Sequence, residues 1–138
     1  MRRAIVALAV SLAAATVTSA CTTPTGSGRN PCGAEWLGRQ AVAAAGTGIE
    51  EAPLVIECIE AIGESRVRVG FSLPSGPDCH LLSRIELVES ADSLSITLFG
   101  AVSDDPSAGA CADEARRVLT EIELQAPVGQ RSLLDGSP

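Results

Sequence analysis

The sequence contains no lysine and no tyrosine, and its only aromatic residues are Trp36, Phe71 and Phe99. The absence of lysine excludes a lysine nucleophile. The scarcity of aromatic rings argues against an aromatic-lined sugar groove. The longest apolar run covers residues 4–15, which is shorter than the roughly 20 residues that a membrane-spanning helix requires.

Positive charge is also scarce, because ten arginines face 17 acidic residues and the formal net charge is −7. Binding to nucleic acid phosphates requires clustered cations. Here only Arg116 and Arg117 are adjacent within the part that follows residue 20. The charge pattern therefore argues against nucleic acid as a partner and is typical of an acidic, soluble domain.

The N-terminus has the anatomy of a bacterial export signal. Arg2 and Arg3 precede the apolar run, and small residues fill positions 16–20 before Cys21. A signal peptidase requires small residues just before the bond that it cuts. The sequence therefore predicts cleavage before Cys21 and an extracellular location.

Residues 17–21, Val-Thr-Ser-Ala-Cys, resemble a lipobox. In such a motif the cysteine sulfur receives a diacylglyceryl group and the freed amine is acylated, commonly with palmitate. Several acyl chains would hold the protein on the outer face of the cell membrane. Thr18 stands where lipoboxes usually carry leucine, so ordinary secretion, with an unlipidated Cys21 thiol, remains the alternative.

Three regions follow from this anatomy. Residues 1–20 are expected to be a cleaved signal peptide, and residues 21–30 a lipid-anchored, flexible tether rich in Thr, Gly and Ser. Residues 31–138 are enough for a single extracellular domain and too few for two. No internal repeat is present.

Five cysteines are an odd number, but setting Cys21 aside leaves four. Their spacing contains no C-x-x-C pair, so structural disulfides are favoured over a zinc or redox site. Three connectivities are possible. We favour Cys32 with Cys58 and Cys79 with Cys111, since each bond would fasten a cysteine of a loop or helix to a neighbouring strand.

One short N-terminal helix is predicted. Asn30 and Pro31 form a typical helix start, and residues 46–48, Gly-Thr-Gly, would end the helix. Ala34, Leu37, Ala41 and Ala45 would share one face of it.

After residue 54 the pattern changes to an alternation of apolar and polar residues, which predicts strands with one buried face. Ile56 and Cys58 would lie on the same face of the first strand. Residues 111–119 fit a helix or a strand, and we prefer a strand from Arg117. The expected strands cover residues 54–58, 66–73, 85–88, 94–98, 117–124 and 131–134. The fold class is therefore mainly β (all-β or α+β), a small antiparallel sheet or sandwich.

Residues 84–98 form a hairpin pattern, and residues 124–136 a second strand-and-turn pattern. Together with the signal, they resemble the C-terminal half of a group of small, uncharacterised actinobacterial lipoproteins. The resemblance implies an anchored β-rich domain. No catalytic residue is established for that group, so none is implied here.

Two places offer catalytic or metal chemistry. His80 is the only histidine, and a Ser-His-Asp arrangement or a metal site with Asp78 would depend on it. No G-x-S-x-G motif accompanies it, and a hydrogen-bonded edge residue is the favoured interpretation. The loop around Asp104, Asp105, Asp113 and Glu114 gathers carboxylates that Ca²⁺ accepts, but it lacks an EF-hand pattern. We predict no metal ion and no cofactor.

The remaining candidates are charged strand residues and glycine turns. A catalytic carboxylate pair would come from Glu57, Glu60, Glu86 or Glu89, although alternation assigns most of these side chains to solvated faces. Arg66 and Arg68 share one face of a strand and would hold an anion or, as we prefer, pair with acids. Residues 26–28 and 46–48 are too short for phosphate loops.

We therefore expect a membrane-anchored, non-enzymatic lipoprotein that binds an envelope protein or has an accessory role. No residue is assigned a catalytic role. The alternatives are a small extracellular hydrolase that uses His80 and a ligand-capturing lipoprotein. The last is weakened by the small size of the domain and its few aromatic residues.

Overall fold

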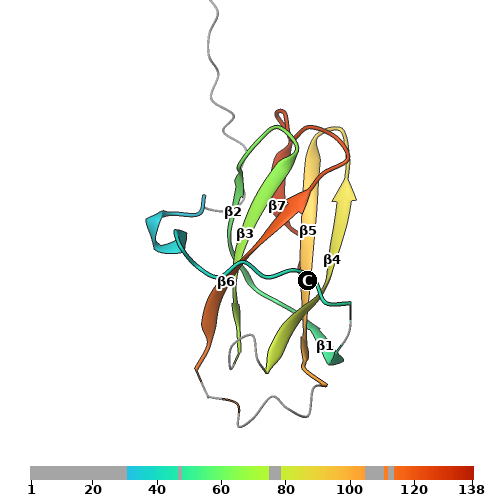
Figure 1. Ribbon diagram of the computed structural model, residues 1–138. Coiled ribbons are helices and arrows are strands. Elements are labelled where there is room, and N and C mark those ends of the chain that lie inside the picture. Colours follow the sequence, from blue (N-terminus) through green and yellow to red (C-terminus); the bar gives the residue numbers. More distant parts are fainter. Residues whose placement is uncertain (1–30, 47, 75–78, 105–110, 112–113) are drawn as a thin grey trace, which may run out of the picture.

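Two mainly antiparallel sheets stack face to face in the computed structural model (Figure 1). The structure describes residues 31–46, 48–74, 79–104, 111 and 114–138. Their elements are η1 (Ala34–Trp36), β1 (Ile49–Pro53), β2 (Ile56–Ala61), β3 (Arg66–Leu73), β4 (His80–Glu89), β5 (Ser93–Val102), β6 (Arg116–Glu123) and β7 (Ser132–Asp135). The expected mainly β fold is confirmed.

Strand β5 is the centre of the first sheet. It pairs with β4 along one edge, while β1 and β7 share its other edge end to end. Strand β7 runs parallel to β5, and the other pairs are antiparallel. The second sheet has the order β2-β3-β6. The predicted strands correspond to β2 to β7. Within the ambiguous residues 111–119, strand β6 begins at Arg116, one residue before the expected start.

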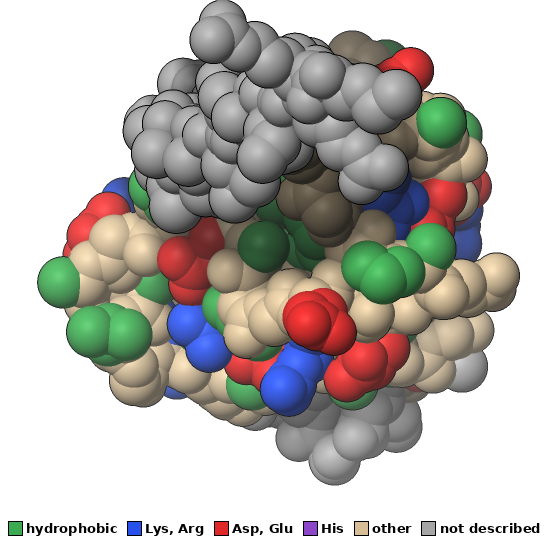
Figure 2. Space-filling model, turned by 90° about the horizontal axis from the view of Figure 1, so that it is seen from above, with side chains coloured by type: hydrophobic (Ala, Val, Ile, Leu, Met, Phe, Trp, Pro, Cys, Tyr) green, Lys and Arg blue, Asp and Glu red, His purple; other side chains and the backbone are tan. Residues whose placement is uncertain are grey.

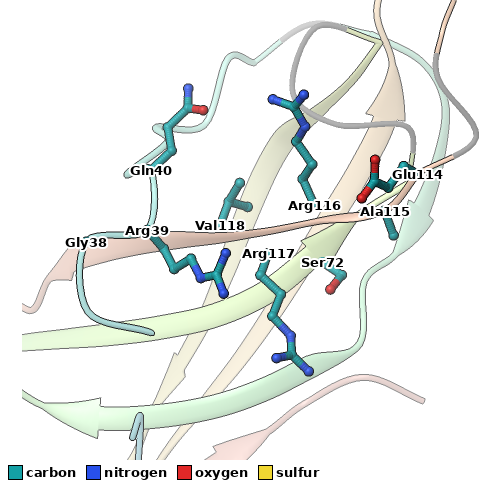
Figure 3. Close-up of a pocket in the computed structure, with 9 residues that line it drawn as sticks. All are labelled: Gly38, Arg39, Gln40, Ser72, Glu114, Ala115, Arg116, Arg117 and Val118. Carbon is teal, nitrogen blue, oxygen red and sulfur yellow. The ribbon is translucent and has the colours of Figure 1, made fainter. Parts of the chain in front are cut away.

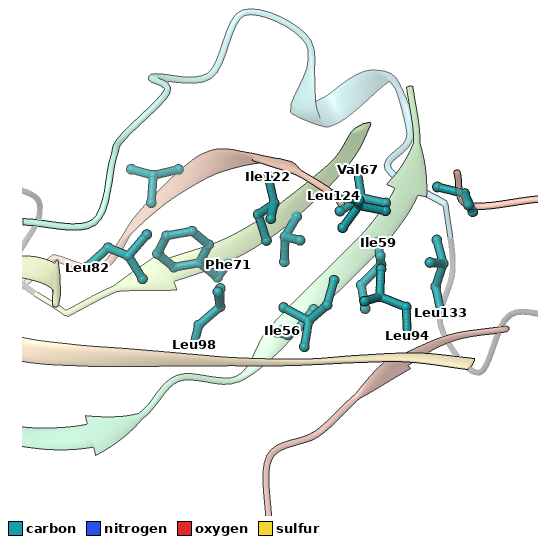
Figure 4. Close-up of a cluster of buried hydrophobic side chains, with 14 of the residues drawn as sticks. Ile56, Ile59, Val67, Phe71, Leu82, Leu94, Leu98, Ile122, Leu124 and Leu133 are labelled. Atoms are coloured by element: carbon teal, nitrogen blue, oxygen red, sulfur yellow. The ribbon is translucent and has the colours of Figure 1, made fainter. Parts of the chain in front are cut away.

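The core lies between the two sheets, where apolar side chains from alternate positions meet (Figure 4). The second sheet contributes a row from β3 that includes Val67, Val69 and Phe71, each fully buried. Leu94, Ile96 and Leu98 of β5 face them from the first sheet. The period-two pattern of the sequence therefore identified most of the core, because side chains in a strand point alternately to opposite faces.

A bulge in β2 corrects one expected orientation. The pairing with β3 shifts between Ile56 and Cys58, which are opposite Phe71 and Gly70. Glu57 is the extra residue of this bulge, so Cys58 does not share the inner face of Ile56. It lies instead on the outer face, in a small apolar cluster with Trp36 and Leu119. A bulge reverses the alternation that follows it, and the residue pattern alone does not reveal where it occurs.

The predicted N-terminal helix is wrong in its extent. Only Ala34–Trp36 form a helical turn, of the 3-10 type. Gly38 adopts a positive φ of 75°, a conformation that suits glycine and interrupts a helix. The residues that follow find their hydrogen bonds on a strand instead, since Val42 N–H donates to the Leu119 carbonyl and Leu119 N–H donates to the Gln40 carbonyl.

Strand β1 is absent from the sequence-based expectation. All five of its residues are exposed, so they carry no alternation of buried and exposed side chains. Glu50 has a positive φ of 57°, and the register with β5 shifts between Ile49 and Ala52. The strand is defined by its pairing with β5 and not by a local pattern.

The segment before β1 crosses the open side of the sandwich (Figure 1). It pairs with β6 at Ala41, opposite Leu119. It then reaches the other sheet, where the N–H groups of Ala45 and Gly46 donate to the carbonyls of Leu82 and Ser83 at 2.8 Å. The segment therefore connects the edge of one sheet to the edge of the other.

Both predicted disulfides are confirmed. Cys32 is bonded to Cys58 of β2, and Cys79 is bonded to Cys111. The first bond fastens the N-terminal segment to the outer face of the second sheet. The second joins the start of β4 to the chain that leads into β6. Disulfides of this kind are typical of proteins that fold outside the cytoplasm.

Gly70 makes the docking of the N-terminal segment possible. A Cβ atom at this position would lie 2.5 Å from the Cys58 Sγ and 2.8 Å from two ring atoms of Trp36. The indole ring, itself only 4% exposed, lies directly against the bare backbone of β3. Close packing of this kind leaves no room for even one methyl group.

We expect Gly70→Ala to lower the free energy of unfolding by about 2 kcal/mol and to displace Trp36, because overpacking forces neighbouring groups apart. Urea denaturation followed by the fluorescence of the single tryptophan measures both effects. Gly63→Ala is the matched control, since a Cβ there would meet only Arg66 Cβ, at 3.9 Å. An equal loss in the two variants would contradict this account of Gly70.

Candidate functional site

An open, polar cleft of about 530 Å³ lies beside the start of β6 (Figure 3). The N-terminal segment forms one wall and β6 the other. The polar side chains of the lining are Arg39, Gln40, Ser72, Glu114, Arg116 and Arg117. Three arginines therefore border a single cleft in a chain whose net charge is −7.

The geometry of β6 spreads two of these arginines over both faces of the strand. Arg117 is opposite Ser72 and Arg116 is opposite Leu73 in the pairing with β3. Neighbouring side chains in a strand point to opposite faces. Arg117 therefore lies on the outer face of the sheet, and Arg116 extends to the other side of the strand (Figure 3).

Arg117 is held in place from two directions. Its Nε lies 3.2 Å from Oε2 of Glu57, and its guanidinium carbon lies 5.5 Å from the centre of the Trp36 ring. Ser72 Oγ donates a hydrogen bond of 2.5 Å to Oε1 of the same carboxylate. The acid and the ring together orient the guanidinium, as expected for an ion pair combined with a cation–π contact.

Arg39 and Arg116 differ from Arg117, because neither has a carboxylate partner within the described part of the chain. Arg39 Nε donates to the backbone carbonyl of Glu35 at 3.0 Å, which leaves its charge uncompensated. Both side chains are exposed. The acid that lines the cleft is Glu114. Among the described residues, the cleft is therefore where this acidic domain exposes guanidinium groups that have no carboxylate partner.

The other described arginines are all paired with glutamates. Arg68 contacts Glu60 at 3.0 Å and Glu121 at 3.1 Å, which raises its pKa further above the ordinary value. Arg66 lies 3.6 Å from both Glu121 and Glu123. The ion pairing that the sequence predicts for Arg66 and Arg68 is confirmed.

The four glutamates that were candidates for a catalytic pair also contact arginines. Glu57 pairs with Arg117 and Glu60 with Arg68, Glu86 with Arg84, and Glu89 with Arg131. Figure 2, which views the molecule from above, shows acidic and basic side chains next to one another on that face. Each of these carboxylates is thus engaged with a guanidinium group.

A further ion-pair cluster on the first sheet had no sequence signal. Arg84 lies 3.5 Å above the Phe99 ring and pairs with Glu51 at 2.9 Å and with Glu86. Hydrogen bonds from Ser83 and then from Arg84 lower the pKa of the Glu51 carboxyl. Glu51 belongs to β1, the strand that the sequence pattern missed.

His80 opens β4 and borders a second, largely apolar hollow of about 320 Å³ with Pro53, Leu54 and Leu73. Its Nδ1 atom is buried and has no hydrogen-bond partner within the described residues. A relay of the Ser-His-Asp type needs an acid at one ring nitrogen, and Nδ1 has none there. Because Nδ1 is itself buried, a solute in the hollow does not reach it.

The proposed metal ligands are not brought together within the described part of the chain. Asp78, Asp105 and Asp113 lie outside the described residues, while Asp104 is exposed and Glu114 borders the arginine cleft. No group of three or more His, Cys, Asp or Glu side chains suited to a metal occurs among the described residues. Cys21, the tether and residues 26–28 also lie outside them, as does Thr47 of the other glycine turn.

Sequence reasoning missed the arginine cleft as a site. Arg116 and Arg117 are adjacent, which was a visible signal, but Arg39 is far from them in the sequence. The three meet only because the Cys32–Cys58 disulfide and the pairing of Ala41 with Leu119 bring the N-terminal segment to β6. Because Arg39 is far from Arg116 and Arg117 in the sequence, the sequence alone does not show that the three lie close together.

No protein-family model, curated protein or solved structure matches this chain. Among the residues described, no helix has the length and apolar character needed to cross a membrane.

Proposed function

We propose that this protein is an exported, lipid-anchored, non-enzymatic module that binds an envelope protein through an anionic group held in the arginine cleft. The observation that carries the proposal is the exposure of Arg39 and Arg116, which have no carboxylate partner among the described residues, next to an oriented Arg117. Guanidinium groups present paired N–H donors that match the geometry of carboxylates and other oxyanions.

The location rests on the N-terminal sequence. The signal-like residues 1–20, Cys21 and the tether that follows would place the domain outside the cell and close to the membrane. The disulfides support an extracytoplasmic location. The resemblance to small actinobacterial lipoproteins points to the same arrangement.

Photo-crosslinking on intact cells tests the cleft. A photoreactive amino acid at Gln40, which lines the cleft, is expected to capture a specific partner, whereas the same group at Val88, 68% exposed on β4, is not. Arg116→Glu should abolish the adduct at Gln40 because it reverses the charge that attracts the anion.

Equal adducts at both positions, or an adduct that survives Arg116→Glu, would refute the cleft as the binding site. The anchor is examined separately by mass spectrometry of the N-terminal peptide from the native host. A diacylglyceryl and acyl group on Cys21 is expected, and an unmodified cysteine would refute lipidation.

A further inference from the structure

Among the described residues, the edge of β6 beside the cleft is incompletely paired. The N–H and the carbonyl of Leu119 both bond to the N-terminal segment, through Gln40 and Val42, at 2.9 and 2.8 Å. Backbone groups of alternate residues in a strand point to the same edge, and no register shift interrupts the pairing of β6 with β3. The N–H and carbonyl of Arg117 therefore point to the same edge as those of Leu119.

The N-terminal segment does not extend its pairing to Arg117. It turns at Gly38, where φ is 75°, and carries Trp36 onto the outer face of the sheet. Within the described residues no backbone group outside the sheet bonds to Arg117. An edge with free donors and acceptors is a template for another strand, and here it borders the arginine cleft on the side of β6.

The charges around this edge select the kind of strand that would pair with it. Arg116 and Arg117 flank the edge on opposite faces, and Arg39 stands on the wall across the cleft. An extended peptide also projects neighbouring side chains to opposite faces. Two adjacent acidic residues of such a peptide would therefore meet Arg116 and Arg117 on their respective sides.

We propose that the cleft takes an extended acidic peptide segment of the partner protein, which adds as a short strand to the edge of β6 at Arg117. This inference rests on the proposed function, because it specifies the anionic group as glutamate or aspartate side chains. Main-chain hydrogen bonds would supply the alignment, and the guanidinium groups would supply the preference for acids.

The test uses the mature chain, residues 21–138, labelled with ¹⁵N, and three probes. These are an acetylated, amidated Val-Glu-Glu-Val-Glu peptide, the same peptide with N-methyl groups on alternate amides, and inorganic phosphate. The unmodified peptide is expected to bind and to slow hydrogen exchange of the Arg117 amide. N-methylation should weaken binding about tenfold, since it removes the main-chain donors.

Arg116→Gln and Arg39→Gln should each weaken peptide binding about tenfold through the loss of a charge-assisted hydrogen bond. Arg66→Gln makes the same change of net charge on β3, outside the cleft, and should change binding less than twofold. The fluorescence of Trp36 verifies that each variant is folded.

The outcomes separate the two proposals. Equal binding of the N-methylated peptide, or binding without slower exchange at Arg117, would overturn strand addition and leave the anion cleft intact. Binding that Arg66→Gln weakens as much as Arg116→Gln would overturn both, as would the absence of binding by peptide and phosphate alike.

Discussion

Replacing both Cys32 and Cys58 with alanine is expected to lower the free energy of unfolding by about 3 kcal/mol, because the bond closes a loop with a sequence separation of 26 residues and restricts the unfolded chain. The variant should also free Trp36, which packs beside this disulfide with Leu119. The emission of the single tryptophan should shift to longer wavelength before global unfolding in urea.

The same variant should weaken anion binding in the cleft. Arg39 and Gln40, which line the cleft, follow directly after the segment that the disulfide fastens. Removing the other bond, with Cys79→Ala and Cys111→Ala, is the matched control. It closes a similar loop, with a separation of 32 residues, and should cost about as much stability. It should leave the native emission of Trp36 unchanged, and identical spectra for the two variants would contradict a specific docking role for Cys32–Cys58.

Phe71→Ala is expected to cost about 3 to 5 kcal/mol, the usual range for deleting a fully buried phenylalanine. Phe71 is fully buried and lies in the middle of the sandwich, where Leu82 and Leu98 of the opposite sheet flank it (Figure 4). The side chain is large, and the surrounding strands are fixed by their pairing, so the cavity would not close.

Urea denaturation monitored by circular dichroism measures this loss as a lower midpoint. Val88→Ala is the control, because Val88 is 68% exposed and its truncation should change the free energy of unfolding by less than about 0.5 kcal/mol. A loss below about 1 kcal/mol for Phe71→Ala would contradict the central place of this residue in the core.

Much of the sheet could be predicted because alternation is a local property. Residues 66–73 and 93–98 show it without interruption, and both lie in strands of the structure. The prediction failed where local pattern and tertiary pairing disagree. Ala34, Leu37 and Ala41 fit a helical face, yet Ala41 pairs with β6 because the edge of a sheet offers hydrogen bonds that an isolated short helix does not surpass.

The candidate site was less predictable than the fold. The ion pairs of Arg68 with Glu60 and Glu121 span 8 and 53 residues, and only the register of three strands brings them together. Arg117 acquires Glu57 as a partner because the pairing of β2 and β6 with β3 brings both side chains to the outer face of the second sheet. Interactions between residues that are distant in the sequence depend on strand register, because a shift of one residue moves each side chain of a strand to the other face of the sheet.

The sequence by itself predicted an export signal and determined the β-rich fold class and the preference for two disulfides, because these follow from local composition, alternation and cysteine spacing along the chain. Tertiary structure alone decided which of the described arginines have no carboxylate partner within the described part of the chain. The packing of the strands and of the turn before β7 pairs Arg66, Arg68, Arg84 and Arg131 with glutamates, while the docked N-terminal segment places Arg39 across the cleft from Arg116. The physical reason is that the attraction between two charges depends on the distance between them in space, and for residues far apart in the sequence only the fold sets that distance.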